Sequence, residues 1–174
     1  MQQIDVIQRT IEFGNRVELC QQAPPGKDPA FTWYRWTIFF RAADGKPLRF
    51  VERVTFKLHE SMTNSRRTVS AEPFEVSEYG WGTFQIEVTV KISSMGNLKF
   101  VLPLRFPHQT VPGKTFEYKT MDMVYFEGLT ASQAALYGDA KDFKPEIPVQ
   151  ELSDWTERLN EIENTLMDEL DIYG

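Results

Sequence analysis

Two short stretches of this sequence carry residues that could bind a ligand. The first is His59-Glu60-Ser61-Met62, and the second is Tyr79-Gly80-Trp81-Gly82-Thr83-Phe84. Each stretch lies where a strand pattern of strict apolar and polar alternation meets a predicted loop. Loops of this kind place small polar groups, glycine backbone and a large aromatic ring within reach of a ligand. We therefore expect a binding site formed by two loops.

The residue types needed for catalysis or metal binding are scarce. The chain has two histidines, His59 and His108, and a single cysteine, Cys20, and their spacing matches no zinc motif. The glycines that flank Trp81 do not precede a helix, so they do not form a phosphate-binding loop. We expect a protein that is not an enzyme and that uses no metal or cofactor. We interpret the pair Arg66-Arg67 as solvated surface.

The charge of the chain is unevenly distributed. Residues 1–139 carry 16 Lys and Arg against 15 Asp and Glu, whereas residues 140–174 carry 3 against 10. Neither part has the clustered basic residues that a duplex-binding surface needs, so we expect no direct nucleic-acid binding. Because no apolar run approaches the roughly 20 residues of a bilayer span and no secretory signal is evident, we expect a soluble intracellular protein.

The first two-thirds of the chain read as strands. Residues 84–92 and 98–106 alternate strictly, which is typical of strands with one buried face. Pro103 cannot donate to a ladder, so its strand is predicted to lie at a sheet edge or to be bulged. Further strands are predicted at residues 4–13, 31–41, 54–58 and 118–127. Frequent turns and the absence of interleaved helices predict an all-β fold, an immunoglobulin-like β-sandwich over residues 1–129.

The pattern becomes helical near Leu129. Thr130 and Gln133 have the spacing of a capping box, which predicts a short helix and then a linker over residues 130–148. Residues 149–174 are predicted to form an acidic amphipathic helix and a possible coiled coil. Its apolar stripe, at spacings of three and four, consists of Leu152, Trp155, Leu159, Ile162 and Leu166. This stripe either packs back on the sandwich or binds a partner helix.

The ordered set of motifs between Phe56 and Phe84 resembles the YEATS domain. The sequence has Leu58-His59-Glu60-Ser61-Met62, then Pro73-Phe74-Glu75-Val76, then Gly80-Trp81-Gly82-Thr83-Phe84. Members of this family carry a strand ending in Leu-His-x-Ser/Thr-aromatic, followed by Pro-Phe/Tyr-Glu/Lys-Val/Ile and Gly-Trp/Tyr-Gly/Ala-x-Phe. Trp36, the stretch 50–54 and the strand 121–126 also match family positions. The resemblance covers residues 5–129.

The resemblance implies a reader of acetylated or crotonylated lysine on histone tails, in the nucleus, as a subunit of a chromatin-modifying or remodelling complex. The implied acyl-lysine-binding residues are His59, Ser61, Met62, Gly80, Trp81 and Gly82. Ser61 would hydrogen-bond the ligand amide, the Trp81 backbone N–H would bond the carbonyl, and the Trp81 ring would form one wall. The C-terminal helix would dock the protein into the complex.

Met62 is the main departure from the family pattern, which places Phe or Tyr there. Methionine is apolar and polarizable, but it has no rigid flat face. An alternative therefore remains open, in which the chain is a structural or scaffold subunit whose acyl-lysine pocket is degenerate. The sequence also leaves open whether Phe31 or Trp33 completes the rim of the pocket.

Overall fold

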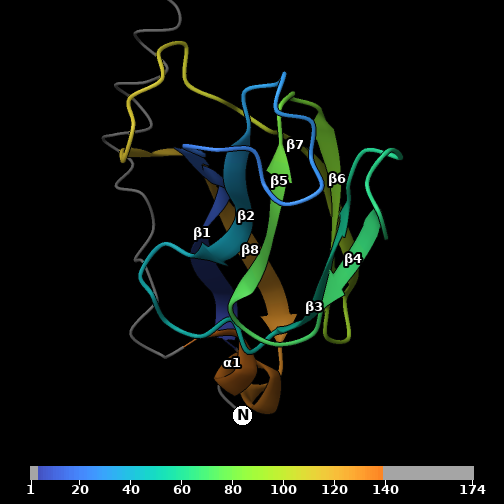
Figure 1. Ribbon diagram of the computed structural model, residues 1–174. Coiled ribbons are helices and arrows are strands. Elements are labelled where there is room, and N and C mark those ends of the chain that lie inside the picture. Colours follow the sequence, from blue (N-terminus) through green and yellow to red (C-terminus); the bar gives the residue numbers. More distant parts are fainter. Residues whose placement is uncertain (1–3, 139–174) are drawn as a thin grey trace, which may run out of the picture.

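The described part of the chain folds into two four-stranded antiparallel sheets packed face to face (Figure 1). A computed structural model describes residues 4–138, with side chains from residue 7 onward. The predicted C-terminal helix, with Leu152, Trp155, Leu159, Ile162 and Leu166, lies outside the described residues. No helix within residues 4–138 is long and apolar enough to cross a membrane.

The first sheet has the strand order β5-β2-β1-β8 and the second has the order β4-β3-β6-β7. The elements are β1 (Ile4–Leu19), β2 (Tyr34–Ala42), β3 (Val51–Lys57), β4 (Arg66–Val69), β5 (Phe74–Gly80), β6 (Gln85–Ile92), β7 (Gly96–Pro103), β8 (Thr115–Leu129) and α1 (Ala131–Tyr137). This arrangement is the immunoglobulin-like β-sandwich that the alternation predicts. Strands β4 and β5 were not among the predicted strands, since each is short or only half-buried.

The core forms between the sheets because alternate residues of each strand point inward. Trp36, Ile38 and Phe40 of β2 face Val54 and Phe56 of β3, and all of them are almost completely buried. Burial of such side chains contributes about 1.5–3 kcal/mol each to folding. Strand β7 lies at a sheet edge, and Pro103 is its last residue, which agrees with the expectation for that proline.

The outer face of the first sheet carries an ion-pair network centred on a buried carboxylate. Glu12, which is 6% exposed, accepts hydrogen bonds from Arg41 Nε and Lys119 Nζ, both at 2.8 Å. The Lys119 hydrogen bond is the largest influence that lowers the pKa of Glu12, and Arg41 lowers it further against the opposing effect of burial. The guanidinium of Arg41 also covers the ring of Phe39, at 4.2 Å from its centroid.

The short helix α1 closes the end of the sandwich opposite the two candidate loops. Thr130 caps it, and the capping box with Gln133 is present in both directions. Tyr137, its last residue, stacks on Phe50, lies edge-on to Phe126 and donates its hydroxyl proton to the carbonyl of Ser93. These contacts fix where the chain leaves the sandwich at Gly138.

Candidate functional site

The loop between β3 and β4 is a compact turn that presents His59 and Ser61 to solvent. It is closed by a hydrogen bond from Leu58 N–H to the Ser65 carbonyl, 2.7 Å, and tightened by one from Met62 N–H to the His59 carbonyl, 3.0 Å. Both His59 and Ser61 are exposed, whereas Met62 is partly buried and packs against the core. The side chain of Met62 is therefore partly buried against the core and partly exposed at the loop.

Hydrogen bonds between His59 and Ser61 define the tautomer of the histidine. The backbone N–H of Ser61 donates to His59 Nδ1 at 3.2 Å, and the Ser61 hydroxyl lies 2.7 Å from the same nitrogen. An N–H group can only donate, so Nδ1 must be the acceptor and the ring proton sits on Nε2. The Ser61 hydroxyl then donates to Nδ1 as well. Its oxygen keeps lone pairs that can accept a hydrogen bond from a ligand N–H.

Arg67 ties this loop to the strand that carries the second loop. Its Nε donates to the Asn64 carbonyl at 2.5 Å, and its Nη2 donates to the Thr63 carbonyl at 2.7 Å and to Glu78 Oε1 at 2.6 Å. Glu78 lies in β5, two residues before Gly80. Arg67 pairs with inward-facing Phe56 in the β-ladder and is half-buried, so the interpretation of this arginine as solvated surface is wrong.

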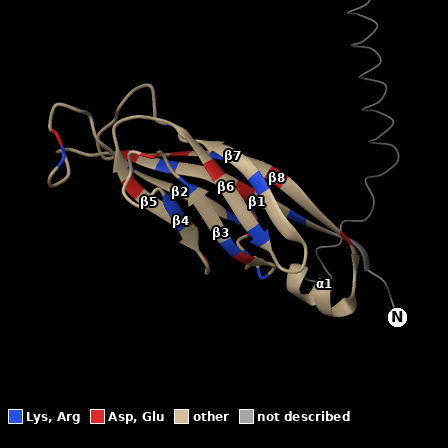
Figure 2. Cartoon of the chain, turned by 90° about the vertical axis from the view of Figure 1, so that its right-hand side faces the viewer, with Lys and Arg blue, Asp and Glu red and all other residues tan. Residues whose placement is uncertain are grey.

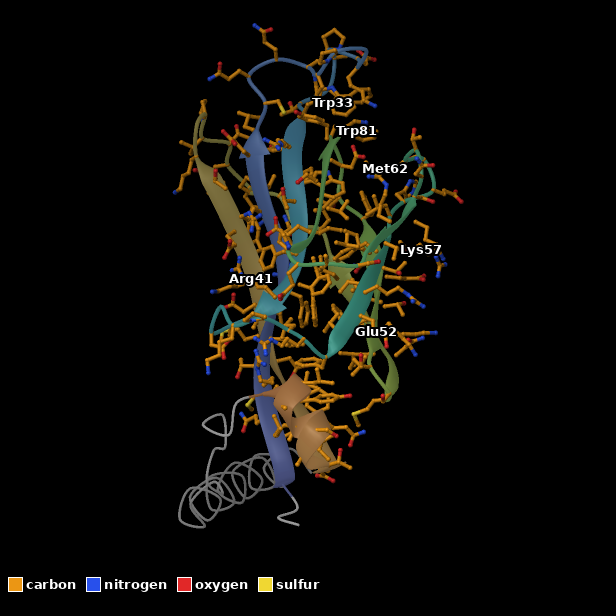
Figure 3. All side chains as sticks on the ribbon, turned by 90° about the horizontal axis from the view of Figure 1, so that it is seen from below. Trp33, Arg41, Glu52, Lys57, Met62 and Trp81 are labelled. Atoms are coloured by element: carbon orange, nitrogen blue, oxygen red, sulfur yellow. The ribbon has the colours of Figure 1, made fainter. Side chains whose placement is uncertain are left out.

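The second loop places Trp81 directly after β5. Its indole is 56% exposed and stacks on Phe31, with ring centroids 4.6 Å apart. Trp33 is buried and donates its Nε1–H to the Asp28 carbonyl. Of the two rings, Phe31 is the one that stacks on Trp81. Figure 3 shows Met62 and Trp81 on neighbouring loops at one end of the sandwich, with α1 at the other end.

The two glycines that flank Trp81 have different structural roles. A Cβ on Gly80 would lie 2.9 Å from Nε1 of the buried Trp36, so the packing of the core alone requires glycine there. A Cβ on Gly82 would meet no atom of the described residues within 4 Å. The chain itself therefore does not require glycine at position 82, and the space beside it is open.

A contiguous group of aromatic rings joins the two loops from below. The ring of His59 lies 5.8 Å from that of Phe84, and Phe84 lies edge-on to Trp36 at 5.9 Å. The indole of Trp36 in turn lies directly against Gly80. The structure thus brings the stretches around Ser61 and Trp81 onto one base of aromatic rings. The sequence did not predict the role of Arg67 and did not decide between Phe31 and Trp33, because no motif marks any of the three.

Comparisons with known proteins agree with this architecture. The YEATS family model matches residues 31–108. The matched part of this chain belongs to the YEATS family. The protein AF-9 homolog of Eremothecium gossypii is 32% identical over 132 residues, which cover 73% of this chain and 64% of that protein. The protein AF-9 homolog of Saccharomyces cerevisiae is 35% identical over 104 residues, which cover 59% of this chain and 45% of that protein.

Solved YEATS domains share the fold of this chain. The Yaf9 YEATS domain bound to H3K27ac matches with a TM-score of 0.65 and 27% identity, over 76% of this chain and 93% of that domain. The Yaf9 YEATS domain recognizing an H3K122suc peptide matches with a TM-score of 0.61 and 28% identity, over 75% of this chain and 91% of that domain. This chain therefore covers almost the full length of those two solved domains.

Proposed function

We propose that this YEATS domain is a non-enzymatic reader of acylated lysine on histone tails. The observation that carries the proposal is the hydrogen-bonded pair of His59 and Ser61, which leaves the Ser61 oxygen free to accept a ligand N–H. An acylated lysine has one amide N–H and one carbonyl. Ser61 provides the acceptor for the first, and the backbone N–H of Trp81 provides the donor for the second.

Selection against unmodified lysine follows from desolvation. An ammonium group that enters an apolar slot loses its hydration, and the free energy required is much larger than for a neutral amide. The half-exposed indole of Trp81 supplies an apolar face for the flat acyl amide, and Phe31 supports that indole from one side. Gly82 leaves room for the ligand because, within residues 4–138, no atom lies in the space where its Cβ would be.

The kind of acyl group depends on Met62. An aromatic residue at this position would stack on a flat crotonyl group, and such stacking contributes about 0.5–1.5 kcal/mol beyond burial. Methionine offers contact without a fixed plane. We infer that this domain accepts both acetyl- and crotonyl-lysine with little preference between them.

The protein is further proposed to act in the nucleus as a subunit of a chromatin-modifying or remodelling complex. The proposed contact with the other subunits is the C-terminal stripe of Leu152, Trp155, Leu159, Ile162 and Leu166. The structures of Yaf9 with acylated histone H3 peptides support the reader function by family likeness.

A second candidate function is that of a scaffold subunit with a degenerate pocket. The observation in its favour is that Met62 is partly buried and packs against the core, so its side chain is only partly available to a ligand. In this alternative the protein would bind its complex and would not distinguish acylated from unmodified lysine.

Two substitutions test the site. Trp81→Ala and Ser61→Ala should each weaken binding of an acetylated or crotonylated histone peptide by about tenfold or more, because the first removes a wall and the second an amide acceptor. Matched controls are Tyr125→Ala, an exposed aromatic on β8, and Thr89→Ala on the outer face of β6. Equal affinity of all four variants, measured by calorimetry, would rule out this site.

A further inference from the structure

A buried arginine at the base of the sandwich has two nitrogen atoms, Nε and Nη2, that find no hydrogen-bond acceptor among residues 4–138. Arg9 of β1 occupies an inward-facing position and is 4% exposed. Its Nη1 donates to the Tyr137 carbonyl at 3.2 Å, and its Nη2 lies 3.6 Å from the carboxylate of Asp44. The part of the chain that the structure describes offers no hydrogen-bond acceptor to its Nε or Nη2. Buried donors without an acceptor are unfavourable, and a guanidinium matches the geometry of a carboxylate or phosphate.

A cavity of about 170 Å³ lies against this arginine. It is lined by Arg9, Lys46, Pro47, Arg49, Ala135, Leu136 and Gly138. Three cationic side chains therefore converge on one hollow, and Asp44 is the carboxylate that the structure places next to Arg9. The combination of a buried guanidinium and two exposed cations is suited to an oxyanion.

The chain continues from this hollow with acidic residues. Gly138 forms part of its wall, and the next residues are Asp139-Ala140-Lys141-Asp142. Residues 139–174 contain 11 acidic and 3 basic residues, whereas the residues before them are nearly neutral. An extended residue spans at most about 3.6 Å, so Asp142 can reach no farther than roughly 14 Å from Gly138. Such a short tether gives these carboxylates a high effective concentration at the hollow.

We propose that the pocket of Arg9, Lys46 and Arg49 binds the carboxylates of Asp139 and Asp142 and so anchors the acidic C-terminal segment to the base of the sandwich. The pocket is lined in part by Ala135 and Leu136 of α1, and α1 lies at the end of the sandwich opposite Met62 and Trp81 (Figure 3). The anchor therefore fixes the start of the C-terminal segment away from the histone site. This consequence rests on the proposed function, but the anchor itself does not.

Hydrogen exchange followed by mass spectrometry on the full chain tests the anchor. The pocket variant Lys46→Glu with Arg49→Glu should speed exchange of the amides of residues 139–150 by about tenfold. The reason is that the pocket would no longer hold this segment against local detachment. High salt should act in the same direction on the wild type. Adding Asp139→Lys and Asp142→Lys to the pocket variant should restore slow exchange, since the charges are again complementary.

The matched control is Arg66→Glu with Lys99→Glu. It makes the same change in net charge on β4 and β7 of the second sheet, which faces the viewer in Figure 2. Neither residue lines the pocket. Acceleration in this control equal to that in the pocket variant would overturn the proposal. Exchange of residues 139–150 in the wild type at the rate of the free peptide would do the same.

A second measurement distinguishes the chain's own carboxylates from an external oxyanion. Inorganic phosphate, titrated by calorimetry, should bind more tightly to the Asp139→Asn, Asp142→Asn variant than to the wild type, because the competing carboxylates are gone. Equal binding of phosphate to both would show that the segment does not occupy the pocket and would overturn the proposal. None of these tests depends on acyl-lysine binding. The reader function can therefore fail while the anchor stands.

Discussion

Substitution of Arg67 by Gln tests whether the two loops must be held together before the ligand arrives. The arginine makes two hydrogen bonds to carbonyls of the β3–β4 loop and one to Glu78 on the strand that leads to Trp81. Charge-assisted bonds contribute about 1.5–3 kcal/mol each when buried. Arg67 and Glu78 are 25% and 29% exposed, so solvent screening reduces the total loss to about 2 kcal/mol.

This loss should appear in the binding of acylated peptide. Without Arg67 the loop that carries Ser61 must be ordered again on binding, and about 2 kcal/mol corresponds to roughly a thirtyfold weaker affinity. The assay is calorimetric titration of an acetylated histone peptide into the full chain, with urea unfolding measured in parallel. Glu78→Gln should give part of the effect, and the double variant should show coupling rather than additivity.

Lys57→Gln is the matched control for Arg67. Lys57 forms an exposed pair with Glu87 at 3.4 Å on the outer face of the second sheet, where such pairs contribute little. Its affinity for the peptide should match that of the wild type. An unchanged affinity in Arg67→Gln, in a variant that remains folded, would refute the idea that Arg67 positions the Ser61 loop.

Three other predictions follow from particular contacts. Met62→Phe should tighten crotonyl-lysine binding by up to about tenfold and acetyl-lysine binding by less; weaker crotonyl binding in a peptide titration would show that residue 62 is not a wall. Gly80→Ala should lower the midpoint of urea unfolding, because its Cβ meets Trp36, whereas Gly82→Ala should leave that midpoint unchanged and reduce only peptide affinity. Glu12→Gln should destabilise the fold by about 2 kcal/mol at neutral pH. The stability that Glu12 contributes is present above its usual pKa of 4.5 and is lost as pH falls through its lowered folded pKa, so the difference between variant and wild type should vanish in acid.

The fold could be predicted from sequence because alternation reports directly on which strand face is buried. The strands at residues 85–92 and 96–103 follow from their apolar periodicity, and Pro103 indicates its place at an edge. Strand β4 could not be predicted, since its four residues, Arg66–Val69, contain only one apolar side chain. The extent of β1 was also underestimated, because Gly14 and Asn15 interrupt the apolar pattern within one continuous strand.

The candidate site was predictable only where a motif marks it. His59, Ser61 and Trp81 lie in such motifs, and the structure brings their loops onto one base of aromatic rings. Arg67 was not predictable, because its role depends on the register that turns it inward opposite Phe56. The stacking of Phe31 on Trp81 depends on the pairing of β2 with β5, which no local pattern reveals. The pocket at Arg9 likewise joins residues from β1, a loop and α1.

The most direct test of the central claim is a pair of titrations with the same histone peptide, once with an acylated lysine and once with that lysine unmodified. A slot that accepts the neutral amide at Ser61 and Trp81 predicts measurable binding of the acylated peptide and binding of the unmodified one at least about a hundredfold weaker, because the ammonium would lose its hydration there. Equal affinity for the two peptides would contradict this account and would leave the scaffold function as the explanation.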